Sequence, residues 1–140
     1  MIVQPDSSTG CGVACVAHIL GLDYGAALKI MADAGATNSA TDHNVKVERL
    51  AAFLENLDNP IYVNQAQSLS EVQGIAFLYV KWPQNKRYRH WVVFRDGYYY
   101  DPGYRSPLQS YPVSPLKILA LYDDPAFGKP LKARRDRKST

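Results

Sequence analysis

The first strongly apolar run of the chain lies close to its start. The segment CGVACVAHIL (11–20) is apolar on almost every side, and a helix with that pattern is buried all round. Gly21 follows it and predicts the end of the helix, while Thr9 or Ser8 is suited to cap its beginning. The pattern therefore predicts a buried helix at the centre of the fold.

Two more helical patterns complete the first half of the chain. One covers 24–33 and is ended by Gly35. The other covers 44–56, where apolar residues form one stripe and Thr41 or Asp42 is suited to precede the first turn. The first half is therefore predicted to be helical.

The second half of the chain has a residue pattern typical of β-strands. Runs rich in β-branched and aromatic residues predict strands over 61–65, 74–82 and 89–95. Asp96-Gly97 is a strong signal for a two-residue hairpin turn, which makes 98–101 the returning strand. The segment 114–123 fits either a short helix or a strand. Helices followed by an antiparallel sheet define the α+β class.

Composition agrees with one folded domain. The chain has 140 residues, of which 46% are apolar and 21% are charged, an ordinary balance for a globular protein. The longest apolar runs are too short to cross a bilayer, and the N-terminus lacks the pattern of a secretory signal. We therefore expect no membrane span and a cytoplasmic protein as synthesised, with signal-independent export left open.

The net charge of +3 is concentrated at the C-terminus. Residues 129–140 hold six basic residues and one acid, so residues 1–128 carry −2. We expect one domain over 1–128 and a mobile basic tail over 129–140, which either solubilises the chain or contacts an acidic partner. The body has no basic stripe interleaved with aromatic residues, which argues against a nucleic-acid partner.

The only two cysteines both lie in the first predicted helix. A thiol at position 11 would sit at the helix N-terminus, where unpaired N–H groups favour the thiolate, and glycines at 10 and 12 would let a substrate approach. Cys15, one turn later, is expected to be a packing residue. A disulfide between the two is opposed by geometry and compartment, and a metal site with His18 lacks a fourth ligand.

A cysteine nucleophile needs a base, and three histidines are candidates. His18 is about two helical turns from Cys11, too far to touch it. His43 lies in a polar loop and is expected to be exposed. Counting outward from the Asp96-Gly97 turn puts His90 and Asp101 on one face of the hairpin, within side-chain reach. That face also holds Val92, and the Cys11 helix is the candidate to pack against it.

These elements in this order resemble the C39-like peptidases of the papain-like superfamily. The matching residues are Gln4, then CGVAC (11–15), HWVVF (90–94) and YYYDPG (98–103), so the resemblance covers residues 4 to about 105. It implies a papain-like fold, with helices packed on a C-terminal antiparallel sheet. It also implies Cys11 as nucleophile, His90 as base, Asp101 as the residue that orients the base, and Gln4 as part of the oxyanion hole.

The expected function is therefore a cysteine peptidase that cleaves a peptide or isopeptide amide through an acyl-enzyme. Its partner would be a peptide or protein substrate, with no cofactor and no metal. Two alternatives remain. One is an effector or toxin of the same fold that modifies a target protein by deamidation or transglutamination. The other is a catalytically silent module that binds a peptide in the same cleft.

Overall fold

A computed structural model describes residues 9–39, 41–104, 106–124, 126 and 128–131. Three helices come first along the chain: α1 (Cys11–Leu20), α2 (Tyr24–Asp33) and α3 (Val47–Glu55). Five strands follow, with a short 3₁₀ turn, Leu69–Glu71, after the first of them. The strands are β1 (Tyr62–Ala66), β2 (Ile75–Lys81), β3 (Arg89–Arg95), β4 (Tyr98–Tyr100) and β5 (Lys117–Tyr122). The predicted α+β class is confirmed.

The five strands form one antiparallel sheet in the order β1-β5-β2-β3-β4. The segment 114–123, for which the sequence allowed a helix or a strand, supplies β5, which lies between β1 and β2. The hairpin has the predicted register, with Arg95 opposite Tyr98. Its turn residues Asp96 and Gly97 both have positive φ, as a two-residue turn of this kind requires.

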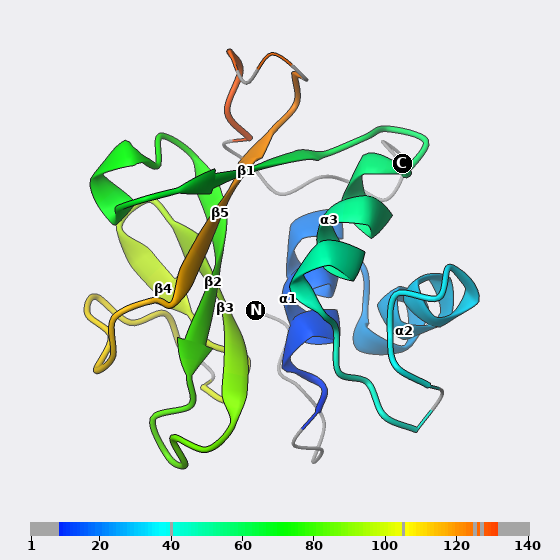
Figure 1. The fold of residues 1–140 in the computed structure, drawn as a ribbon, viewed down its shortest axis with the longest axis horizontal. Helices are drawn as coiled ribbons and strands as arrows, with labels where there is room; N and C mark the ends of the chain where they lie inside the picture. Colours follow the sequence, from blue (N-terminus) through cyan, green and yellow to red (C-terminus); the bar gives the residue numbers. More distant parts are fainter. Residues whose placement is uncertain (1–8, 40, 105, 125, 127, 132–140) are drawn as a thin grey trace.

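The three helices gather on one side of the sheet, with α2 farthest from it (Figure 1). All ten residues of α1 are buried, as the apolar run predicted, and Gly21 ends the helix in the left-handed conformation. The core between the layers includes Val13 and Leu20 of α1 and, from the sheet, Phe77, Trp91 and Val93. The helix α1 is therefore held on the face of the sheet to which Trp91 and Val93 belong.

A second apolar cluster covers the opposite face of the sheet. Val92 belongs to it, together with Leu78, and loop residues such as Tyr111 and Val113 pack over them. The expectation that α1 packs on the Val92 face was therefore wrong. The two strand faces are both apolar, so alternation along β3 could not tell which one α1 would cover.

The predicted start of the third helix was also wrong. Lys46, whose backbone is extended, is the residue that precedes the helix, not Thr41 or Asp42. Val45 instead forms a bridge with Thr37, and its carbonyl accepts a hydrogen bond from the indole Nε1 of Trp91 at 3.2 Å. A long-range contact thus takes Val45 out of the helix, although its apolar side chain is buried as the pattern implied.

The folded body extends past residue 128, where the sequence placed the start of the tail. Leu131 is buried, and its N–H donates to Leu121 O at 2.8 Å while its carbonyl accepts from Ile75 N at 2.7 Å. Gly74 permits this contact, since a Cβ there would lie 2.2 Å from Leu131 O. The folded body therefore includes Leu131, and 132–140 fall outside the described residues.

These contacts predict unequal effects of two truncations. Ending the chain after residue 128 should lower the free energy of unfolding by about 2–4 kcal/mol, because it exposes the Leu131 site and removes three backbone hydrogen bonds made by Lys129 and Leu131. Ending it after residue 131 removes most of the same basic residues and should leave the melting temperature nearly unchanged. Thermal unfolding of both variants checks this; equal melting temperatures would show that 129–131 add no stability.

Among the described residues, no single helix has both the length and the apolarity needed to cross a membrane. Only α1 and α2 taken together pass that test, and the chain bends by 106° between them.

Candidate active site

Cys11 is the first residue of α1, as predicted, but no side chain caps the helix in the described part of the chain. Gly10 is the N-cap, and the Thr9 hydroxyl accepts a hydrogen bond from His43 N at 3.2 Å instead. Ser8, the other predicted cap, lies outside the described residues. The helix start therefore places the thiol next to backbone N–H groups that no side chain of the described residues caps.

The glycines on either side of Cys11 serve close packing rather than substrate access. A Cβ at Gly10 would lie 2.6 Å from the Tyr24 hydroxyl oxygen. A Cβ at Gly12 would lie 3.0 Å from both the Trp91 ring and Val45. Protein groups thus fill the space through which a substrate was predicted to approach Cys11.

The Cys11 thiol lies against the edge of β3. Trp91 N–H donates to Cys11 Sγ at 3.4 Å, and Cys11 is only 4% exposed. The donor is available because the described pairs of β4 with β3 stop at Val93, so β4 does not reach Trp91. A short edge strand thus leaves an opening into which α1 inserts the thiol beside His90.

His90 and Asp101 form a buried pair, and the reach predicted from the hairpin is confirmed. His90 Nε2 lies 2.6 Å from Asp101 Oδ1, with the two side chains 5% and 2% exposed. Asp101 also accepts from Gly103 N at 2.8 Å and from the Tyr111 hydroxyl at 2.5 Å. Three donors converge on one carboxylate, which fixes the side of the imidazole that faces it.

The electrostatics of the pair favour its charged form. Burial alone would lower the pKa of His90, but hydrogen bonds to Asp101 and to Cys11, with the negative charge of both, raise it to about 9. Burial alone would raise the pKa of Asp101, but His90, Tyr111 and Gly103 together lower it below its usual value. Since Asp101 occupies Nε2, Nδ1 is the ring nitrogen left for the thiol.

Two aromatic residues complete the surroundings of His90, and sequence reasoning missed both. The Trp82 ring lies 6.2 Å from the His90 ring, between centroids, and shields it. Tyr111 comes from the loop before β5, in a segment without a periodic pattern, and burial with the bond to Asp101 raises the pKa of its hydroxyl. No local signal in the sequence predicts that a loop tyrosine will donate a hydrogen bond to a carboxylate ten residues away.

The other candidate residues lie elsewhere. Cys15 is buried with a free thiol whose pKa is raised by burial, as expected of a packing residue. His18 is buried, and its ring lies tilted against the Tyr100 ring at 5.0 Å between centroids. His43, expected to be exposed, is half-buried, and its Nδ1 lies 2.7 Å from the Tyr24 hydroxyl oxygen.

Within the described ranges, no three histidine, cysteine or acidic side chains are grouped so that they could hold a metal ion. The Cys11–Cys15–His18 alternative is therefore not assembled. Gln4, the predicted oxyanion residue, lies outside the described residues, so its position relative to Cys11 is not part of this structure.

A small cavity of about 150 Å³ opens beside the thiol. Its lining comes from α1, the loop before α3 and the facing strands: Thr9, Cys11, Asn38, Asn44, Val45, Lys46, Tyr79, Arg89 and Trp91. A larger cavity of about 480 Å³ lies between α2 and α3 and contains none of the predicted site residues. Of these two cavities, the small one is lined by Cys11.

The charge on His90 can be tested directly. By NMR titration of its ring, His90 should show a pKa near 9 in the wild type and a value closer to the ordinary 6.5 in Asp101→Asn. Because the pKa is higher in the folded than in the unfolded state, this pair stabilises the fold fully below about pH 6.5. That contribution is lost as the pH rises through about 9. A wild-type value at or below 6.5 would contradict the assignment.

Searches against protein-family models, curated proteins and solved structures gave no match to this chain. The geometry of Cys11, His90 and Asp101, together with the motif resemblance, is therefore the basis on which a function is argued.

Proposed function

We propose that this protein is a papain-like cysteine hydrolase, similar to the C39-like peptidases, that cleaves a peptide or isopeptide amide. The observation that carries the proposal is the buried His90 ring, which lies 2.6 Å from Asp101, while the next residue on the strand, Trp91, donates its N–H to the Cys11 thiol at 3.4 Å. Nucleophile, base and orienting carboxylate thus come from three separate parts of the chain and meet at one edge of the sheet.

In the first half-reaction the Cys11 sulfur attacks the carbonyl carbon and forms a carbon–sulfur bond. Backbone N–H groups at the start of α1 are suited to hold the resulting oxyanion, with Gln4 as a further donor by resemblance. The protonated His90 then gives its Nδ1 proton to the leaving nitrogen, and the carbon–nitrogen bond breaks. The amine departs and the acyl group stays on Cys11 as a thioester.

In the second half-reaction His90 takes a proton from water, and the hydroxide attacks the thioester. The carbon–sulfur bond breaks, the acid leaves, and the proton returns to the Cys11–His90 pair. The same acyl-enzyme formed on a side-chain amide would give deamidation with water and transglutamination with an amine. Peptide or isopeptide cleavage is the proposal, and the alternatives differ only in which amide is attacked and what resolves the thioester.

Incubation with a complex mixture of peptides, read by mass spectrometry, tests the proposal. New termini should form with the wild type and be absent with Cys11→Ala. Mass gains of about one unit at glutamine or asparagine, without new termini, would show deamidation instead. If the wild type and Cys11→Ala give the same peptides, the chain is no hydrolase of this kind.

A further inference from the structure

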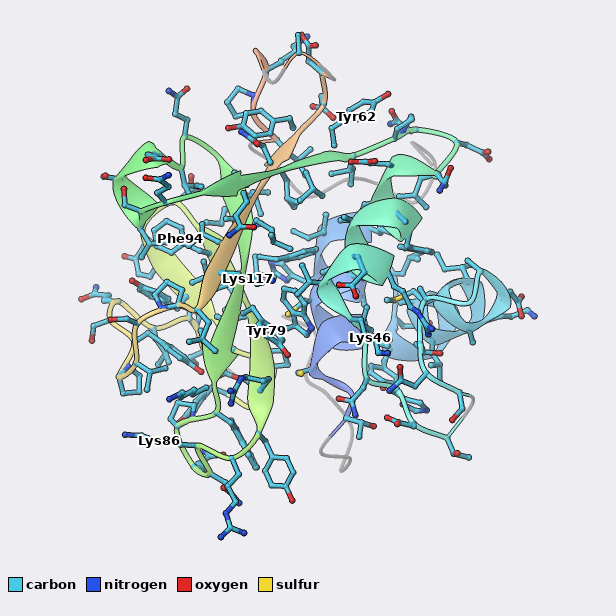
Figure 2. The ribbon with its side chains drawn as sticks, viewed as in Figure 1. Lys46, Tyr62, Tyr79, Lys86, Phe94 and Lys117 are labelled. Atoms are coloured by element: carbon cyan, nitrogen blue, oxygen red, sulfur yellow. The ribbon has the colours of Figure 1, made fainter. Side chains whose placement is uncertain are left out.

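The cavity beside Cys11 has an unbalanced set of charges. Two of its lining side chains, Lys46 and Arg89, are cationic, whereas none of the described residues that line it is acidic. Lys46 stands at the start of α3, and Tyr79 faces it from β2 across the two layers (Figure 2). Arg89 is the first residue of β3, next to His90. The cations therefore lie on both sides of the approach to the thiol.

Neither cation is neutralised by a neighbour in the described part of the chain. Lys46 and Arg89 are both exposed, neither makes an ion pair there, and the Arg89 guanidinium donates only to Lys86 O, at 3.5 Å. A cation without a partner at the mouth of a cavity attracts anions into it. The Cys11 thiolate does not cancel this charge, because the proposed His90 imidazolium balances it.

Two described acids, Asp42 and Glu48, come from the segment that supplies part of the lining, and neither is itself a lining residue. Asp42 accepts from the side-chain amides of Asn38 at 3.2 Å and Asn44 at 2.8 Å, so its carboxylate orders the loop. Glu48 acts on Tyr79: burial raises the pKa of that hydroxyl, and Glu48 adds to the rise while Arg89 opposes it. The described lining of the cavity therefore carries two cationic side chains and neither of these carboxylates.

We propose that this cavity binds a carboxylate of the substrate, placed within about one residue of the carbonyl that Cys11 attacks. Lys46 and Arg89 are the specificity-determining residues. This inference rests on the proposed function, since it assigns the substrate class of the same site. The carboxylate can belong to an aspartate or glutamate side chain or to a chain terminus, which share this chemistry.

The size of the cavity agrees with such a group. At about 150 Å³ it is smaller than the roughly 300–1,000 Å³ of sites that enclose a whole small molecule. It has room for one short side chain, and the remainder of a peptide would lie outside. Two unit charges roughly 6 Å apart in water attract enough to change a rate constant about threefold, so we expect about that factor from each cation.

Three thiol reagents that differ only in charge test the proposal. They are N-iodoacetyl-glutamine amide, which is neutral, N-iodoacetyl-glutamate amide, with a side-chain carboxylate, and N-iodoacetyl-glutamine, with a terminal carboxylate. In each the sulfur displaces iodide and forms a carbon–sulfur bond. For each reagent, the second-order rate constant for alkylation of Cys11 is divided by the rate constant for alkylation of glutathione by the same reagent. The acid-to-neutral ratio then reports the attraction of the carboxylate.

In the wild type we expect one or both acidic reagents to react about tenfold faster than the neutral one. The faster of the two identifies the source of the carboxylate. Lys46→Gln and Arg89→Gln should each lower the ratio about threefold, and the double variant should bring it close to one. Lys86→Gln with Arg87→Gln, in the turn between β2 and β3, removes the same charge elsewhere and should leave the ratio unchanged.

The results separate this inference from the proposed function. Equal rates for all three reagents in the wild type would overturn the carboxylate site even if Cys11 is strongly activated. So would an acid-to-neutral ratio that falls as far in the variant with Lys86→Gln and Arg87→Gln as in the double variant of Lys46 and Arg89. If Cys11 reacts no faster than glutathione with the neutral reagent, the proposal that Cys11 is an activated nucleophile is contradicted. The acid-to-neutral ratio can still be measured in that case, and it decides whether the cavity attracts a carboxylate.

Discussion

Replacing Cys11 with alanine is expected to abolish peptide cleavage, with a loss of at least about 10³-fold, while the fold persists. The sulfur is the only atom in the proposed scheme that forms a bond to the substrate, so no neighbour can replace it. The side chain is small, and the Trp91 N–H that donates to it at 3.4 Å is a weak contact to lose. Cleavage assays and thermal unfolding of the purified variant measure the two effects.

Cys15 supplies the matched control for this experiment. Its thiol is buried one turn further along α1, and burial raises its pKa, so it should stay protonated and unreactive. Cys15→Ala should keep full activity and lose about 1 kcal/mol of stability through a small void. Brief iodoacetamide treatment near neutral pH should label Cys11 first. Preferential labelling of Cys15 would reverse the assignment of the nucleophile.

Replacing Asp101 should affect both rate and stability, in an order set by its hydrogen bonds. Asp101→Ala leaves His90, Tyr111 and Gly103 without their common acceptor in a buried site. We expect it to cost about 3–5 kcal/mol of stability and to reduce the rate about 10³-fold. His90→Ala should reduce activity further, nearly to background, because it removes the base itself.

Asp101→Asn should be milder. The amide oxygen can accept from His90 and Gly103, while the amide NH₂ donates to the Tyr111 oxygen, because a hydroxyl can turn and accept. The rate should fall about 10- to 100-fold with little change in melting temperature. If the Asn and Ala variants, assayed at a temperature at which both are folded, have equal activity, the residue at position 101 does not act through His90.

Tyr111→Phe is a separate test of how Asp101 is held. It removes one donor to Asp101 Oδ2 and keeps the ring stacked on Tyr99 at 5.6 Å between centroids. We expect a severalfold fall in kcat with KM nearly unchanged, because Asp101 is held less firmly, and a higher pKa of His90 by NMR, because the carboxylate then shares its charge with one donor fewer. Unchanged kcat and unchanged His90 titration would leave Tyr111 as a packing residue only.

The parts of the site that could be predicted from sequence are those governed by local geometry. The hairpin turn fixes its own register because a two-residue loop leaves one way to pair the strands, and this sufficed to join His90 with Asp101. The apolar run after Cys11 likewise predicted α1 to the residue. Both inferences use spacings of a few residues.

What escaped prediction depends on contacts between distant segments. Val45 leaves the helical pattern because Thr37 and Trp91 bind it, and Leu131 joins the body through strands far earlier in the chain. The face of β3 that α1 covers depends on which loops fill the other face. Tyr111 reaches Asp101 only because the loop before β5 folds back over the sheet. Such pairings have no local pattern to reveal them.

The central claim is that Cys11 and His90 act as one ionised pair. The most direct test is the rate of Cys11 alkylation by iodoacetamide at pH 6, in the wild type and in His90→Ala, with both folds verified. If the imidazolium stabilises the thiolate, the wild type should react at least about tenfold faster, because fewer thiols are ionised once His90 is removed. Equal rates in the two proteins would contradict the pairing and, with it, the proposed mechanism.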